Sequence, residues 1–174
     1  MRKILVVVDM QNDFIDGSLG TPEAVAIVEN VKAKIREYDP ADIFVTMDTH
    51  GPEYLTTQEG RNLPVEHCIK GSIGWLVRKD IAELLDGAKV YEKPTFGSTA
   101  LAKDIAGIAA GEEIEIEVIG LCTDIWVVSN ALLLKASMPE VTISVDPACC
   151  AGVTPESHQA ALKTMQMCQI RIKD

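Results

Sequence analysis

Three observations predict an α/β fold built on a parallel sheet. A continuous apolar run from Ile4 to Val8 is typical of a strand buried on both faces. Short β-branched runs alternate with longer segments of helical period along the chain, as in parallel sheets covered by helices. A length of 174 residues with 47% hydrophobic residues is enough for one well-filled core. We therefore expect a six-stranded parallel sheet with helices on both faces, in a single domain over residues 1–174.

The individual elements follow from capping residues and apolar spacing. A helix is expected from Thr21, a cap residue followed by proline and glutamate, to about Tyr38. A second strand begins at Ile43 and ends at Asp48. The same alternation then predicts helices near 76–85, 98–109, 123–137 and 155–166, and strands at 88–91, 114–119, 141–145 and 169–172. Residues 49–75 fit neither period, and a loop of this length inside a domain is usually functional.

The charge, the apolar segments and the cysteines of the chain indicate which partners and which cellular compartment to expect. The chain has 16 basic and 26 acidic residues, a net charge of −10, which argues against binding to nucleic acid or to an anionic membrane surface. No segment approaches the roughly 18 apolar residues that span a bilayer, and the start is too short for a signal peptide. Five cysteines without a Cys-x-x-Cys pair suit reduced thiols. We expect a cytoplasmic protein that binds small molecules and, through apolar helix faces, copies of itself.

Polar side chains recur where the predicted strands end. Asp9 follows the first strand, Asp48 and His50 end the second, Lys93 follows the third and Cys122 follows the fourth. In open α/β sheets, ligands bind outside the carboxyl ends of the strands. These residues are therefore expected on one rim of the sheet.

The most specific cluster combines carboxylate and imidazole groups. Asp48 and His50 are two residues apart, so in an extended segment they point the same way. Glu59 and His67 lie in the same long loop, which can fold back to them. These groups suit Zn²⁺, Mn²⁺ or Fe²⁺. The alternative is that the two histidines are only solvated, but two of the three histidines in the chain lie in this loop.

Three further residues carry a functional and a structural interpretation each. Asp9 needs a partner if it is buried, and it is either a general base facing a cation or a strand-end cap. Lys93 is the candidate cation or, alternatively, a surface residue. Cys122 begins a strand-to-helix turn whose backbone N–H groups suit an oxyanion and favour a thiolate, or it is a small buried hydrophobe.

Taken in order, these motifs resemble those of the isochorismatase-like cysteine hydrolases. The chain is most similar to the nicotinamidase/pyrazinamidase branch, and the match extends over nearly its whole length. The resemblance implies a three-layer αβα fold with a six-stranded parallel sheet. The motifs are Asp9-x-Gln11-Asn12-Asp13-Phe14, Asp48-x-His50, His67-Cys68, Lys93-Pro94-x-Phe96 and Gly120-x-x-Thr123-Asp124.

The resemblance also implies roles in acyl transfer. Asp9 would be the general base, and Lys93 would hold and activate a thiol. Phe14 and Leu121 would contact the substrate. The peptide bond before Cys122 would be cis, and its N–H would help form the oxyanion hole.

The metal and the substrate are implied in the same way. Asp48, His50, Glu59 and His67 would hold a divalent metal, zinc first, with manganese or iron as alternatives. The substrate would be a small amide, with nicotinamide converted to nicotinate and ammonia.

One position departs from the family pattern. The nucleophilic cysteine of the family follows Thr-Asp by one residue, and here that position is Trp126. An indole cannot form a thioester, and its ring would fill much of a nicotinamide-sized pocket. Many nicotinamidases also carry an aromatic residue just before the loop histidine, where this chain has Leu-Pro-Val-Glu at 63–66. We therefore predict impaired turnover.

Several explanations of Trp126 remain open. It is an introduced or accidental change, it marks a non-catalytic ligand-binding or scaffold member, or Cys122 has taken over as nucleophile. The last ranks lowest, because residues four apart on a helix are about 5–6 Å apart whereas reaction geometry tolerates errors nearer 1 Å. Hydrolysis of another small amide is a further alternative. An isochorismatase is disfavoured, because that metal-free branch has no use for Asp48, His50 and His67.

Overall fold

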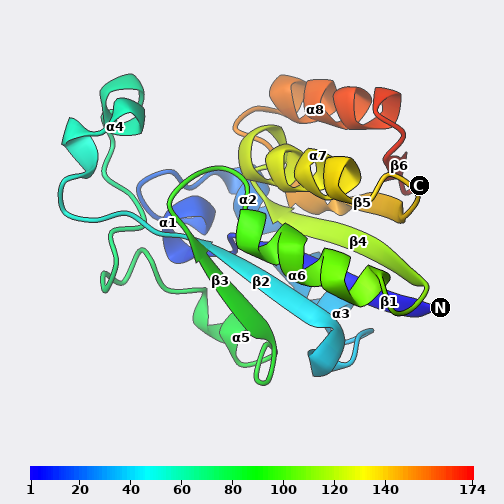
Figure 1. Cartoon of the computed structure of the whole chain (residues 1–174). Helices are drawn as coiled ribbons and strands as arrows, with labels where there is room; N and C mark the ends of the chain where they lie inside the picture. The colour runs from blue at the N-terminus through cyan, green and yellow to red at the C-terminus, as the bar shows by residue number, and fades with distance from the viewer.

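Six parallel strands form one sheet in the computed structural model, which describes residues 1–174 (Figure 1). Their order across the sheet is β3-β2-β1-β4-β5-β6. This confirms the predicted α/β class with a six-stranded parallel sheet. The strands are β1 (Arg2–Val8), β2 (Ile43–Asp48), β3 (Lys89–Lys93), β4 (Ile114–Leu121), β5 (Thr142–Ala151) and β6 (Arg171–Ile172).

Helices cover both faces of this sheet. In Figure 1, α6, α7 and α8 lie over the face toward the viewer and α3 lies behind the sheet. A 3₁₀ turn at Tyr54–Thr56 precedes α4, and a π-helical turn at Thr123–Val127 leads into α7. The helices are α1 (Asn12–Ile15), α2 (Pro22–Ala26), α3 (Val28–Ile35), α4 (Gln58–Asn62), α5 (Lys79–Ala82), α6 (Thr99–Ala109), α7 (Val128–Ser137) and α8 (Pro155–Met167).

Local sequence explains where several helices begin. The side chains of Thr21 and Ser98 accept hydrogen bonds from backbone N–H groups in the first turns of α2 and α6. Thr154 and Ser157 form a reciprocal capping box at the start of α8, with proline in its first turn. The run from Ile4 to Val8 is fully buried, as expected for a central strand covered on both faces.

Some predicted element boundaries were wrong. The single helix expected from Thr21 to Tyr38 is two helices that meet at Ile27, and Val25, which fits the apolar spacing of the expected helix, is 45% exposed. The period continues across the break, so the pattern alone does not reveal it. Within 49–75, the 3₁₀ turn and α4 are too short to produce a period. Strand β5 is longer than predicted, because after a register shift Cys150 and Ala151 pair with the end of β4.

The carboxyl ends of the central strands meet closely, and this places the site. Gly120 near the end of β4 has a φ of +120°, and a Cβ there would lie 2.1 Å from the carbonyl oxygen of Val8. Only glycine therefore allows β4 to approach β1 at this point. Helix α4 stands beyond this rim, and both chain termini lie at the opposite end of the sheet (Figure 1). No helix has the length and apolar character needed to cross a bilayer.

Candidate active site

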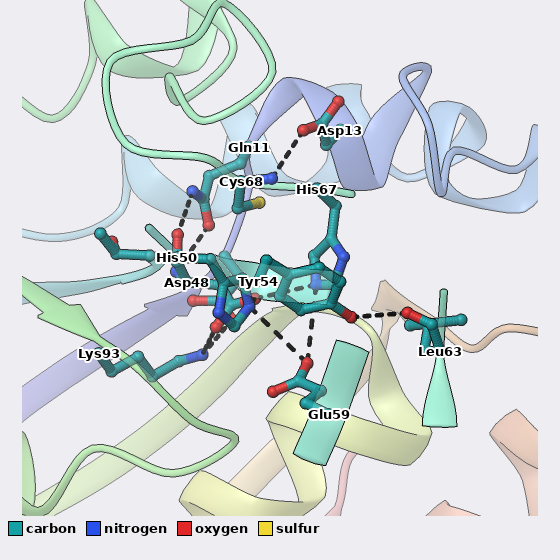
Figure 2. Close-up of polar contacts among 12 residues, drawn as sticks. Gln11, Asp13, Asp48, His50, Tyr54, Glu59, Leu63, His67, Cys68 and Lys93 are labelled. Carbon is teal, nitrogen blue, oxygen red and sulfur yellow. Dashed lines mark hydrogen bonds and ion pairs between the residues drawn. The ribbon is translucent and has the colours of Figure 1, made fainter. Parts of the chain in front are cut away.

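The loop after β2 brings four potential metal ligands together (Figure 2). Asp48 Oδ2 lies 3.0 Å from His50 Nε2 and 3.4 Å from His67 Nε2. Glu59 Oε1, from α4, lies 3.7 Å from each of these nitrogens. All four ligand atoms lie within 4.8 Å of one another. Neighbouring ligands of a tetrahedral zinc are about 3.3 Å apart when the metal–ligand bonds are about 2.0 Å, so the spacing fits such an ion.

The hydrogen bonds of His67 also suit a metal ligand. Its Nδ1 lies 2.9 Å from the carbonyl oxygen of Val65, which can only accept, so Nδ1 carries the proton. The other nitrogen, Nε2, is buried and has no hydrogen-bond partner. A backbone carbonyl that fixes the tautomer in this way is typical of metal-binding histidines.

Two side chains hold this cluster in place, and sequence analysis assigned neither of them a role. Gln11 accepts a hydrogen bond from the N–H of Asp48 and donates one to its carbonyl oxygen, both at 2.8 Å. The ring of Tyr54 packs against both His50 and His67, with centroids 4.7 and 4.9 Å away. Gln11 belongs to the motif at residues 9–14, whereas the only signal for Tyr54 is that it is an aromatic residue in a polar loop.

An ion pair lies next to the cluster. Lys93 Nζ is 2.6 Å from Asp9 Oδ2 and 3.4 Å from Asp48 Oδ1, and all three side chains are buried. Thr46 donates a hydrogen bond to Asp9 Oδ1 at 2.6 Å. Burial raises the pKa of Asp9 from 3.8 to about 6, although the charge of Lys93 opposes this. The structure thus brings together the proposed base and cation.

Charge counting favours a divalent cation at this rim. Three carboxylates, those of Asp9, Asp48 and Glu59, face the single ammonium of Lys93. Two negative charges are left without a compensating charge if the histidines are neutral. Burial and the nearby Asp48 raise the pKa of Glu59, as expected for an excess of negative charge. A bound divalent ion would balance the group.

Trp126 occupies the space between this ion pair and the aromatic wall of the site. Its ring centroid is 4.3 Å from that of Phe14 and 5.8 Å from Lys93 Nζ, and the residue is 2% exposed. Phe14 in turn lies 5.6 Å from the ring of His67. The indole Nε1 is buried without a hydrogen-bond partner, which costs about 1–3 kcal/mol. The ring fills this space at the expense of an unsatisfied donor.

The turn before Trp126 has the shape implied by the family resemblance. The peptide bond between Leu121 and Cys122 is cis, and the N–H groups of residues 125–127 all donate to the carbonyl oxygen of Cys122. Burial raises the pKa of Cys122 to about 12, so its thiol is neutral near pH 7. Leu121 is fully buried and lines neither of the two cavities that border Glu59, one of which is also lined by Trp126. The structure therefore does not bring Leu121 to the open part of the site.

Comparison with known proteins agrees with this fold. The family model described as the isochorismatase domain matches residues 3–172. A pyrazinamidase/nicotinamidase from Streptococcus mutans superposes with a TM-score of 0.83 at 25% identity, covering 98% of this chain and 99% of that one. The pyrazinamidase of Pyrococcus horikoshii, solved in complex with zinc, gives 0.80 at 24% identity, with 100% and 99% covered.

A second activity is present among the similar structures. The N-carbamoylsarcosine amidase from Thermoplasma acidophilum gives a TM-score of 0.75 at 28% identity, covering 99% of this chain and 96% of that one. No curated protein sequence matches the chain.

Proposed function

The chain belongs to the isochorismatase domain family, and from this premise we propose that it is a metal-dependent amide hydrolase of the nicotinamidase type in which Trp126 holds turnover low. The proposal takes residues 1–174 as one domain with one site. Similar structures named as nicotinamidases, pyrazinamidases and an N-carbamoylsarcosine amidase support amide hydrolysis as the reaction class. The Asp48 cluster supports metal dependence, with zinc favoured because the similar pyrazinamidase was solved with it.

Four residues of the chain would hold the metal. Asp48, His50 and His67 would be its main ligands, and Glu59, the most exposed of the four side chains, the weakest. The ion would supply a Lewis acid that binds the ring nitrogen of a heteroaromatic amide. Gln11 and Tyr54 keep the ligand atoms at the required spacing.

The acid–base part of the reaction falls to Asp9 and Lys93. With a thiol at position 126, the Asp9 carboxylate would accept its proton, and the thiolate would attack the amide carbon. Ammonia would leave with a proton returned from Asp9, and water would hydrolyse the thioester. Lys93 lies between Asp9 and Asp48, where its charge keeps both carboxylates ionised. In this chain the thiol is the one missing component.

The observation that carries the proposal is the position of the Trp126 ring. It lies against Phe14 and over Lys93, in the space that a small substrate next to the base would occupy. The same observation favours a second candidate, a member that binds a ligand without turnover. Cys122 is the weaker alternative nucleophile, because burial raises its pKa to about 12.

The test is ammonia release from nicotinamide at matched metal loading. We expect little release by the native chain and a clear gain in Trp126→Cys, because that substitution supplies the nucleophile and vacates the pocket. Cys122→Ala serves as the matched control and should leave the native level unchanged.

Two results would redirect the proposal. Robust native turnover that is lost in Cys122→Ala would make Cys122 the nucleophile. A Trp126→Cys chain that folds and binds metal but releases no ammonia would favour the binding role.

A further inference from the structure

Two cavities open side by side next to the metal cluster, and one of them is lined by Trp126. One, of about 250 Å³, is lined by Glu59, Asn62, Leu63, Phe96, Ile125 and Trp126. The other, of about 350 Å³, is lined by His50, Thr57, Gln58, Glu59, Asn62, Pro94, Thr95 and Phe96. They share Glu59, Asn62 and Phe96, so they form one groove, which we call the outer groove. It lies between α4 and the loop that follows β3.

The walls of the outer groove are held by buried hydrogen bonds. The side chain of Asn130, fully buried in α7, donates to the carbonyl oxygens of both Phe96 and Trp126, at 3.2 and 2.8 Å, and accepts from the N–H of Ser98 at 2.9 Å. On the opposite wall, the Tyr54 hydroxyl donates to the carbonyl oxygen of Leu63 at 2.9 Å (Figure 2). The side-chain amide of Asn130 thus fixes the backbones of Phe96 and Trp126 relative to each other. Walls fixed in advance lower the entropy lost on binding.

The two halves of the groove differ in polarity. The half next to Trp126 is bounded mainly by the apolar side chains of Leu63, Phe96 and Ile125. Phe96 is 42% exposed, so a ligand there would remove apolar surface from water. The other half presents the amides of Gln58 and Asn62 and the hydroxyl of Thr95. Amides and hydroxyls both donate and accept hydrogen bonds, which matches an uncharged polar group.

The charged side chains around this groove disfavour an anionic ligand. Neither half is lined by a lysine or arginine, and Lys93 is already engaged by two carboxylates. The one acidic side chain of the lining, Glu59, belongs to the metal cluster and would be compensated by the ion. An uncharged ligand therefore fits better than an anion or a cation.

We propose that the outer groove binds an uncharged compound made of one aromatic ring and a short amide tail. The ring lies in the apolar half against Phe96, Leu63 and Ile125, and the tail lies in the polar half against Gln58 and Asn62. The inference deepens the proposed function and rests on it in one respect: that Trp126 fills the space between Phe14 and the Asp9–Lys93 ion pair, so that a ligand binds outside it. A single-ring carboxamide such as nicotinamide is too short to occupy both halves.

Calorimetric titration of the metal-loaded chain with N-benzylacetamide tests the proposal, with nicotinamide as the comparison ligand. We expect N-benzylacetamide to bind at least about tenfold more tightly than nicotinamide. Phe96→Ala should weaken its binding by about tenfold or more, since the ring loses one wall. Leu63→Ala, on the opposite wall, tests the same half if Phe96→Ala disturbs folding. Met167→Ala, at the last residue of α8, which is 77% exposed and lines neither half of the groove, is the matched control and should bind like the native chain.

Charged analogues and metal removal complete the test. Phenylacetate and phenethylammonium should each bind at least about tenfold more weakly than N-benzylacetamide, because the groove has no basic side chain and its one acidic side chain, Glu59, is engaged by the metal in the loaded chain. Binding should change by less than about threefold when the metal is removed, so it is separable from ammonia release by Trp126→Cys. Equal affinity for nicotinamide, equal affinity for either ion, or native affinity in both wall variants would overturn the proposal.

Discussion

Two groups of charged side chains lie on the same sheet, and only one of them has an ammonium group for each of its largely buried carboxylates. Around Glu117 in β4, the Tyr38 hydroxyl donates to Oε2 at 2.7 Å, Lys173 Nζ lies 2.5 Å from the same oxygen, and Lys34 Nζ lies 3.3 Å from Oε1. Lys34 also pairs with Asp146 at 3.2 Å. The two largely buried carboxylates, Glu117 and Asp146, therefore meet two ammonium groups, and the third carboxylate near Lys34, that of Glu37 at 3.4 Å, is exposed to solvent.

The other group, at the carboxyl ends of the central strands, has more carboxylates than ammonium groups. Asp9, Asp48 and Glu59 share one ammonium, that of Lys93, and the lone pair of His67 Nε2 has no partner. The pKa values of Asp9 and Glu117, one from each group, shift in opposite directions. Burial raises the pKa of Asp9 to about 6, whereas at Glu117 the bonds from Lys173 and Tyr38 outweigh burial and lower the pKa. The comparison shows that buried charge alone does not mark a site, but a deficit of positive charge beside free ligand atoms does.

Removing one lysine from each group should give the largest difference in the free energy of unfolding. Lys93→Met leaves Asp9 and Asp48 buried without a cation and should lower the free energy of unfolding by about 3–5 kcal/mol. Lys173→Met should cost about 1 kcal/mol or less, because its side chain is 41% exposed and Lys34 and Tyr38 remain. Urea unfolding of the metal-free proteins measures both. Equal losses would mean that the two groups are alike.

The two groups should also respond to pH in opposite directions. The pKa of Asp9 is raised, so its contribution to stability is complete below pH 3.8 and is lost as the pH rises through about 6. The pKa of Glu117 is lowered, so its contribution is present above pH 4.5 and is lost as the pH falls through its folded-state value. In unfolding curves of the metal-free chain, Asp9→Asn should remove the first trend and Glu117→Gln the second. Unchanged slopes in both variants would contradict these assignments.

The smallest effect is expected from Trp126→Phe. The substitution keeps an aromatic ring against Phe14 and removes the unpartnered N–H, so the gain and the lost contacts should nearly cancel. We expect the free energy of unfolding to change by less than about 1 kcal/mol. Trp75→Phe is the matched control and should cost more, because the Trp75 indole donates to Thr49 Oγ1 at 2.9 Å. The reverse order would mean that the Trp126 N–H is satisfied in solution.

Much of the fold could be predicted because its signals are local. The apolar run of β1 and the Thr21 cap of α2 identify elements without tertiary information. Strand-end placement also predicted that Asp9, Asp48 and Lys93 would share one rim, because carboxyl ends of parallel strands meet there. The break at Ile27 and the extension of β5 depend on packing and register, which the pattern does not encode.

The supporting residues of the site could not be predicted for the same reason. Asn130 joins the backbones of Phe96 and Trp126, which are distant in sequence, through bonds that leave no spacing signal. The contact of Tyr54 with both histidines depends on how the long loop folds. Leu121, placed with the substrate by family resemblance, is in the core because its side chain points into the sheet packing.

The metal content of the purified protein tests the central claim most directly. The unbalanced rim should retain one equivalent of a divalent metal, measured by elemental analysis after dialysis, and His50→Ala should retain far less because it removes one of the ligands in the cluster. Glu117→Gln, in the balanced group, should retain the native amount. Equal metal content in the native chain and His50→Ala, or none in either, would contradict the account.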